Sequence, residues 1–232
     1  MTSDEVMQFL QDHGSEQTRK VLRKHGARDP FYGVRISDLT IIQKKVKKDH
    51  NLALKLYATG NSDAMYLAGM IADPELFDRA TLQEWTKKAY WYMISDYTIP
   101  GVASRSPVGF NLALEWIDSD SEFVASAGWA TLSSYISLYN LDQDKLIIFD
   151  NLLERVEKNL HHSKNRVRYT MNNFIIACGS YQKELNEKAL KFSSSIGKVS
   201  VDMGGTACKV PDAKQYINKV ISMGKLGVKR KK

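Results

Sequence analysis

Lysine and arginine residues gather in two stretches of this 232-residue chain, and the chemistry they suit best is phosphate binding. Residues 18–55 carry eleven bases against three acids, and residues 225–232 carry five bases and no acid. Residues 1–17, by contrast, hold four acids and no base. This asymmetry favours a polyanion as the partner, although lysines also cover solvated helix faces in many proteins.

One group of these cations has a spacing that suits a phosphate backbone. Lys44, Lys47 and Lys48 share one face of an expected helix, because residues three and four apart are neighbours. Arg35 precedes them closely. We expect these four side chains to contact the backbone of a nucleic acid.

A second group of cations opens a later helix. Lys164, Arg166 and Arg168 stand in its first turn, where free backbone N–H groups and side-chain charges could meet one phosphate together. A solvated helix start explains the same residues equally well.

The segment 198–213 is the most unusual in composition. Its glycines permit a positive φ or a close backbone approach, and Thr206 and Lys209 could hold an anion. The spacing is not that of a Walker A loop, so we favour a structural turn before a helix. Cys178 and Cys208 are the two cysteines, and they form neither a metal-binding nor a disulfide pattern. We expect no metal and no cofactor.

Helical periodicity covers nearly the whole chain and predicts an all-α fold. Ser3 is the expected N-cap of a first helix that Gly14 ends, and a second helix ends at His25-Gly26. Thr81 to Glu84 has the spacing of a capping box before a further helix. The remaining expected helices cover 38–48, 51–58, 61–73, 107–117, 121–139, 146–160, 163–178, 182–193 and 212–223. Only 198–203 reads as extended.

About a dozen helices of this length, joined by short turns, suggest antiparallel pairs stacked as a superhelical solenoid. The pairs recur roughly every 35–45 residues, the range of HEAT-type repeats, though a compact irregular bundle fits the pattern too. We expect one domain over 1–224 and a mobile basic tail over 225–232. No apolar run is long enough to span a bilayer, so we expect a monomeric, cytoplasmic protein without membrane contact.

Five stretches, taken in order, resemble the AlkD-like DNA alkylation repair family. They are Phe31–Ser37, Lys48–His50, Leu52–Tyr57, Asn61–Pro74 and Leu82–Trp85. The resemblance implies a curved array of HEAT-like repeats whose concave side holds double-stranded DNA. It also implies a DNA glycosylase that excises alkylated, cationic bases. In such a site a carboxylate and aromatic side chains face the deoxyribose and stabilise its developing positive charge, and an arginine lies near the DNA backbone.

The resemblance assigns site residues by position. Asp96 occupies the place of the catalytic carboxylate, with Trp91 or Tyr92 as its aromatic partner. Trp129 and Phe174 fall near the places of the other sugar-facing groups. A helix-end acid is an equally good interpretation of Asp96.

Three departures from the family pattern weigh against catalysis. Met93 stands where an aspartate is expected, Gly128 where the arginine is expected, and Phe174 in place of a tryptophan. Two hypotheses therefore remain. The first is a DNA-binding family member, either a glycosylase or a branch with altered activity. The second is a non-catalytic helical-repeat scaffold that binds a protein or a structured nucleic acid.

Overall fold

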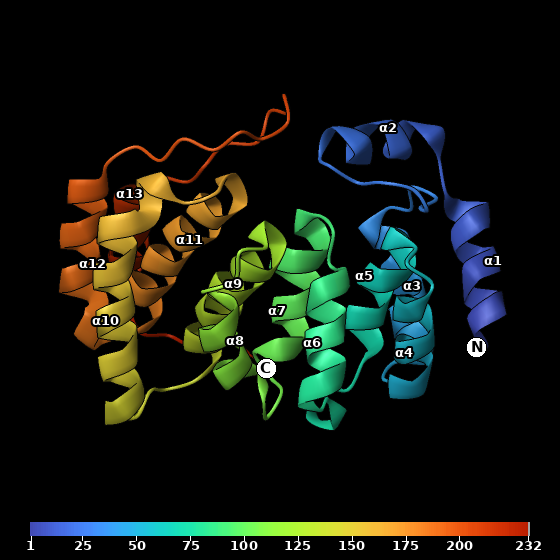
Figure 1. Cartoon of the computed structure of the whole chain (residues 1–232), viewed down its shortest axis with the longest axis horizontal. Coiled ribbons are helices and arrows are strands. Elements are labelled where there is room, and N and C mark those ends of the chain that lie inside the picture. The colour runs from blue at the N-terminus through green and yellow to red at the C-terminus, as the bar shows by residue number, and fades with distance from the viewer. Residues whose placement is uncertain (232) are drawn as a thin grey trace.

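The computed structural model describes residues 1–231, and all the regular secondary structure in that range is helical, with no β-strand (Figure 1). The helices of the first part are α1 (Ser3–His13), α2 (Glu16–Lys24), α3 (Ile36–Val46), α4 (His50–Ala58), α5 (Ser62–Ile71), η1 (Pro74–Leu76) and α6 (Arg79–Lys88). Those of the second part are η2 (Ile94–Thr98), α7 (Ile99–Ala103), α8 (Gly109–Trp116), α9 (Glu122–Leu138), α10 (Gln143–Asn159), η3 (Leu160–His162), α11 (Asn165–Tyr181), α12 (Lys183–Ile196) and α13 (Ala213–Ser222). The predicted all-α class is confirmed.

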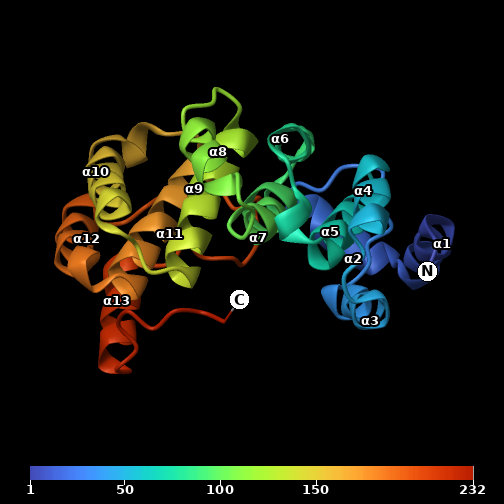
Figure 2. The same ribbon diagram turned by 90° about the horizontal axis from the view of Figure 1, so that it is seen from below.

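The helices form two rows that bend into a curved array. Figure 2 shows α4, α6, α8 and α10 in an outer row and α5, α7, α9 and α11 in an inner row. Helices α3 and α13 project at the two ends of the inner row, so the inner row is the concave side. The solenoid of HEAT-like helix pairs predicted from the sequence is confirmed.

Side-chain oxygens at the N-caps fix where many helices begin. Asp49, Asn61, Asp142 and Asp212 each accept a hydrogen bond from a backbone N–H of the first turn. The predicted caps of α1 and α6 are wrong. Thr2 rather than Ser3 caps α1, in a reciprocal capping box with Glu5.

The start of α6 is the second correction. Asp78 caps this helix, and its carboxylate accepts from the backbone N–H of Thr81 at 2.7 Å. Thr81, predicted to begin a capping box, therefore lies inside the first turn. Threonine and aspartate side chains can both accept hydrogen bonds from the unpaired N–H groups of a first helical turn. Residue spacing alone therefore does not show which of them is the cap.

One inner-row element was absent from the sequence prediction. Residues 94–98 form η2, a π-helical turn, and continue directly into α7. Pro100 and Gly101 are typical of a turn, yet Pro100 stands in the first turn of α7, where its missing N–H costs no hydrogen bond. This turn places Asp96 and Tyr97 on the inner row, and π-helical turns are frequent at functional sites.

Large aromatic side chains fill the space between the rows. Tyr57 and Trp85 stack at 3.8 Å between ring centroids, and the Tyr57 hydroxyl donates to the Trp85 carbonyl at 2.6 Å. In the second half Phe174 packs against Trp129 and Phe149. No helix within residues 1–231 has both the length and the apolar character required to cross a bilayer.

The C-terminal segment packs against the helices, so the expectation of a mobile tail is wrong over residues 225–231. The backbone N–H groups of Gly227 and Arg230 donate to the carbonyls of Ser180 and Ser137. The final residue of the predicted 225–232 tail lies outside the described residues. The side chain of Lys229 adds further hydrogen bonds between this segment and the helices.

Lys229 caps two helices at once. Its Nζ donates to the carbonyl oxygens of Ile136 and Tyr181, at 2.9 and 2.6 Å, and to Gln182 Oε1 at 3.2 Å. Ile136 lies in the last turn of α9 and Tyr181 ends α11, so the ammonium meets the negative ends of two helix dipoles. Burial lowers the pKa of Lys229.

Candidate nucleic-acid interface

Asp96, the residue at the expected carboxylate position, is enclosed by hydrogen-bond donors. Its Oδ1 accepts from the hydroxyls of Ser95 and Ser126, both at 2.6 Å. Its Oδ2 accepts from Nη2 and Nε of Arg166, at 2.5 and 3.1 Å. Only 3% of the Asp96 side chain is exposed. Because a carboxylate offers about four lone-pair sites, every one of them is occupied.

Arg166 is the counter-ion of Asp96 and lies between two aromatic rings. Its guanidinium carbon stands 4.5 Å from the ring centroid of Tyr92 and 4.3 Å from that of Tyr169. The prediction that Arg166 contacts a phosphate is wrong, because its side chain is only 9% exposed and is paired with Asp96. Burial raises the pKa of Tyr92, and the charge of Arg166 opposes that rise. Tyr92 is half-buried and faces a cation of its own protein.

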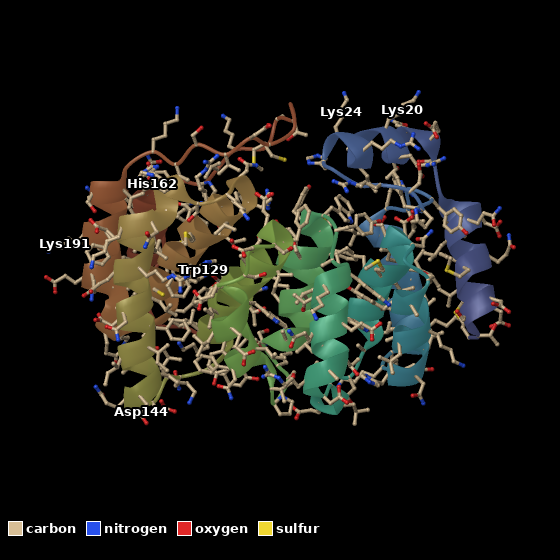
Figure 3. All side chains as sticks on the ribbon, in the orientation of Figure 1. Lys20, Lys24, Trp129, Asp144, His162 and Lys191 are labelled. Carbon is tan, nitrogen blue, oxygen red and sulfur yellow. The ribbon has the colours of Figure 1, made fainter. Side chains whose placement is uncertain are left out.

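The other predicted sugar-facing aromatics belong to the core, and their assignment is wrong. Trp91 is buried, and its indole N–H donates to the Ser62 hydroxyl at 2.9 Å. Trp129 and Phe174 are fully buried and meet edge to face. Figure 3 shows Trp129 lying among the helices.

Gly128 has a packing role. A Cβ at this position would lie 2.8 Å from the backbone nitrogen of Ile117 and 2.9 Å from the carbonyl oxygen of Ala113. Any larger residue would push α8 and α9 apart. The absence of the family's arginine at this place is therefore coupled to close packing of two helices.

A carboxylate of the protein itself binds the first turn of α11. The backbone N–H of Arg166 donates to Glu122 Oε1 at 2.7 Å, so a carboxylate of the same chain occupies the helix start. Lys164 is exposed and donates to the Asp120 carbonyl, while Arg168 donates to Ser163 O and Asn165 Oδ1. Phosphate contacts by Lys164 and Arg168 stay a prediction.

The lysines near α3 lie at one end of the array. Lys44, Lys47 and Lys48 retain solvent exposure, but α3 ends at Val46, two residues earlier than predicted. Lys47 has a positive φ of 62°, and Lys48 Nζ pairs with Asp73 at 3.2 Å. Arg35 is also exposed and pairs with Asp38. Their contact with nucleic acid stays a prediction.

Part of the early basic stretch is neutralised within the protein. Arg19 and Arg23 both pair with Asp29, at 2.8 and 3.0 Å. Lys20 and Lys24 point away from the body on the outer side of α2 (Figure 3). The positive charge read from the sequence is therefore less concentrated in the fold than along the chain.

Two neighbouring hollows open on the inner row. Their volumes are about 550 and 590 Å³, and they share four lining residues, Tyr66, Tyr97, Gly101 and Arg105. Of the cations from residues 18–55, Lys48 alone borders them. Of the four cations expected to contact a nucleic-acid backbone, Arg35, Lys44 and Lys47 therefore do not border these hollows.

Tyrosines line the hollow of about 550 Å³ instead, and we call it the tyrosine groove. Its tyrosines come from α5, η2, α11 and α13, and they are Tyr66, Tyr97, Tyr169, Tyr181 and Tyr216. Asp96 also borders it. Sequence reasoning missed this set, although a signal existed: residues 169, 173, 177 and 181 all border the groove and stand four apart, on one face of α11.

The 198–213 segment bridges the two ends of the array. Gly204 has a φ of +69°, and a Cβ there would lie 2.2 Å from the Lys24 carbonyl oxygen at the end of α2. The Thr206 hydroxyl donates to Met203 O and accepts from the Cys208 N–H, as in a local turn. The glycine permits the close approach.

No group of three His, Cys, Asp or Glu side chains suited to a metal occurs in residues 1–231. The fold and this inner surface define a HEAT-like repeat protein whose concave side carries a buried ion pair beside an open aromatic groove. Residues 6–200 match the family model of the DNA alkylation repair enzymes. The chain belongs to the DNA alkylation repair family.

Relatives in sequence and in structure match the chain over nearly its whole length. An uncharacterised protein of Listeria monocytogenes is 36% identical over 225 residues, which cover 94% of this chain and 97% of the relative. One from Listeria innocua is 35% identical with the same coverage. A solved structure from a family of proteins related to the HEAT-like repeat DNA glycosylases, with affinity for branched DNA structures, has a TM-score of 0.89. It is 35% identical and covers 100% of this chain and 99% of its own.

Proposed function

We propose that this protein binds branched DNA on its concave side and does not excise bases. The observation that carries the first half is the full-length likeness to a solved protein from a family with affinity for branched DNA structures. Agreement extends from end to end of both chains, so the inner row and its two projecting ends are shared rather than a core alone. Double-stranded arms and a branch point are the partner that this surface would bind.

The Asp96 cluster supports the second half of the proposal. A carboxylate that stabilises an oxocarbenium-like sugar must present an uncompensated oxygen to it. Both oxygens of Asp96 are occupied, and the charge of Arg166 compensates the carboxylate. Three of the four predicted sugar-facing aromatics are buried as well. The polar atoms at the family's catalytic position serve the fold.

A direct test compares DNA forms and chemistry in the same preparation. Fluorescence anisotropy with a four-way junction, a three-way junction and a linear duplex should give tighter binding to the two branched forms at equal salt. Duplex DNA methylated at N7 of guanine should release no base beyond the spontaneous rate. Equal affinity for junction and duplex contradicts the first half, and enzyme-dependent base release contradicts the second.

The monomeric state and the cytoplasmic location remain predictions. Sedimentation of the free protein and of its junction complex measures the first. A single chain per junction is the expected stoichiometry.

A further inference from the structure

The tyrosine groove contains several tyrosines that are neither fully buried in the core nor scattered over the surface. Tyr97 and Tyr216 are 48% and 49% exposed, and Tyr66, Tyr169 and Tyr181 are partly exposed. Five rings from four elements converge on one hollow. Scattered exposed aromatics are ordinary, but a contiguous set lining a concavity marks a binding surface.

Within residues 1–231, three of the five groove tyrosines have no aromatic ring or cation packed on their rings, whereas Tyr169 lies under the Arg166 guanidinium and Tyr97 meets Tyr92 edge to face. Among the described residues, Tyr66, Tyr181 and Tyr216 stack on no other ring. Tyr57 in the core differs, because its ring stacks on Trp85 and its hydroxyl is bonded. Burial, with smaller contributions from neighbouring groups, raises the pKa of Tyr97. Its hydroxyl is therefore neutral at physiological pH and does not repel phosphates.

The floor and one wall of the groove suit a flat, polar-edged ligand. Small side chains such as Gly101, Ala130 and Ala177 give depth between the rings. Asn173 on the wall is half-buried, and its amide has no hydrogen-bond partner among the described residues. An amide carries donors and an acceptor together, which is the pattern that reads a base edge.

The charge and size of the groove favour unpaired nucleotides over an intact duplex. Its cations are Arg105 and Arg230, and Arg230 is held there because the segment around Lys229 is anchored. Two guanidinium groups suit a short stretch of phosphates rather than a duplex surface. The volume of about 550 Å³ lies in the range of small-ligand pockets, roughly 300–1,000 Å³.

We infer that the tyrosine groove receives unpaired bases at a DNA branch point by stacking them on its rings. Aromatic rings hold bases of any sequence because every base has a π-face. This inference rests on the proposed function and adds how the branch would be recognised. The protein binds the bases that the branch point leaves unpaired, while the paired arms lie along the ends of the inner row.

The test uses the full-length chain and three DNA probes. They are a linear duplex, a fully paired four-way junction, and the same junction carrying unpaired thymines at its centre. A further copy of the last probe carries 2-aminopurine at an unpaired position, whose fluorescence falls when it stacks. The wild-type protein should bind the unpaired junction most tightly and quench the probe.

Two matched variants separate ring stacking from other roles. Replacing Tyr97→Ala and Tyr216→Ala together should weaken binding to the unpaired junction by about 5- to 160-fold for each stacked base and remove the quenching. Tyr97→Phe with Tyr216→Phe keeps both rings and should retain binding and quenching. Ile147→Ala, at an exposed position of the outer helix α10, controls for loss of a large exposed side chain.

The outcomes distinguish the groove from the proposed function. An alanine variant that binds and quenches like the wild type overturns the groove while junction binding stands. An equal loss on the duplex and on the unpaired junction also overturns it, because the tyrosines would then serve general contact or folding. A wild-type protein that binds the linear duplex as tightly as either junction contradicts the proposed function itself.

Discussion

Two neighbouring regions of the inner row differ in how their polar atoms are bonded. One is the Asp96 cluster, formed by Asp96, Ser95, Ser126 and Arg166, and the other is the tyrosine groove. Around Asp96 both carboxylate oxygens accept hydrogen bonds from the chain itself, and the ion pair with Arg166 is buried. In the groove three of the five rings are unstacked, the Asn173 amide is unpartnered among the described residues and two arginines border the hollow. A polar group already paired inside the protein stabilises the fold, and one left unpaired at a concave surface is available to a ligand.

The contrast predicts first that breaking the buried pair damages the fold. Arg166→Ala leaves the Asp96 carboxylate buried without its counter-ion, and such a loss costs about 3–5 kcal/mol of unfolding free energy. Urea unfolding followed by circular dichroism measures it. Replacing both partners, Asp96→Asn with Arg166→Met, should restore part of the stability, because no buried charge is left alone. A destabilisation below about 1 kcal/mol for Arg166→Ala, well under the range for a broken buried pair, would show that the pair does not support the fold.

A second prediction concerns the wall of the groove. Lys229→Ala removes donors from three partly buried oxygens at the ends of α9 and α11, which costs about 1–3 kcal/mol. The same variant should weaken junction binding, because the segment that places Arg230 is released. Lys231→Ala is the matched control, since that side chain is exposed. If the two variants melt at the same temperature, Lys229 does not anchor the segment.

A third prediction compares a core tyrosine with a groove tyrosine. Burial raises the pKa of Tyr57 well above 10, and burial also raises that of Tyr66. Below pH 10 both residues are neutral in the folded and unfolded chains. Above it the unfolded chain loses protons that the folded chain keeps, so stability falls by up to about 1.4 kcal/mol per pH unit for each such group.

Unfolding at pH 9, 10 and 11 measures this slope. Tyr57→Phe should make the alkaline fall shallower, although it lowers stability at every pH by removing the bond to Trp85 O. Tyr66→Phe should change the slope less, because its side chain is partly exposed. Identical slopes for the two variants would mean that the groove is as closed to water as the core.

Sequence reasoning reached the fold but only part of the surface. Helical periodicity and cap residues such as Asp49 and Asn61 depend on local spacing, so the all-α class and most helix positions followed from the chain alone. The resemblance put Asp96 at the family's carboxylate position on the inner row. It did not show that Arg166, 70 residues later, would neutralise it.

Interactions between distant residues account for the errors at the site. The sequence does not show whether Trp129 and Phe174 face a groove or the core. The packing of α9 on α11 buries both side chains. Charge along the chain overstated the basic surface because Arg19 and Arg23 pair with Asp29 after the loop folds back. The four-residue spacing on α11 was readable, but its meaning depended on knowing which face of α11 is concave.

The smallest expected effect tests whether the lysines near α3 bind the arms of a branched DNA while the groove takes its centre. Lys44→Ala with Lys47→Asn removes two charges near the end of α3, and asparagine tolerates the positive φ at position 47. The affinity for DNA falls between about 50 and 200 mM salt. For each lysine–phosphate interaction removed, the factor by which it falls should become about 3.5-fold smaller. The quenching of 2-aminopurine should be unchanged, because no base-stacking residue is altered. Lys55→Ala, on the outer helix α4, is the control. If the salt dependence changed in that control alone, the DNA arms would bind the convex side. The groove would then not face the branch point.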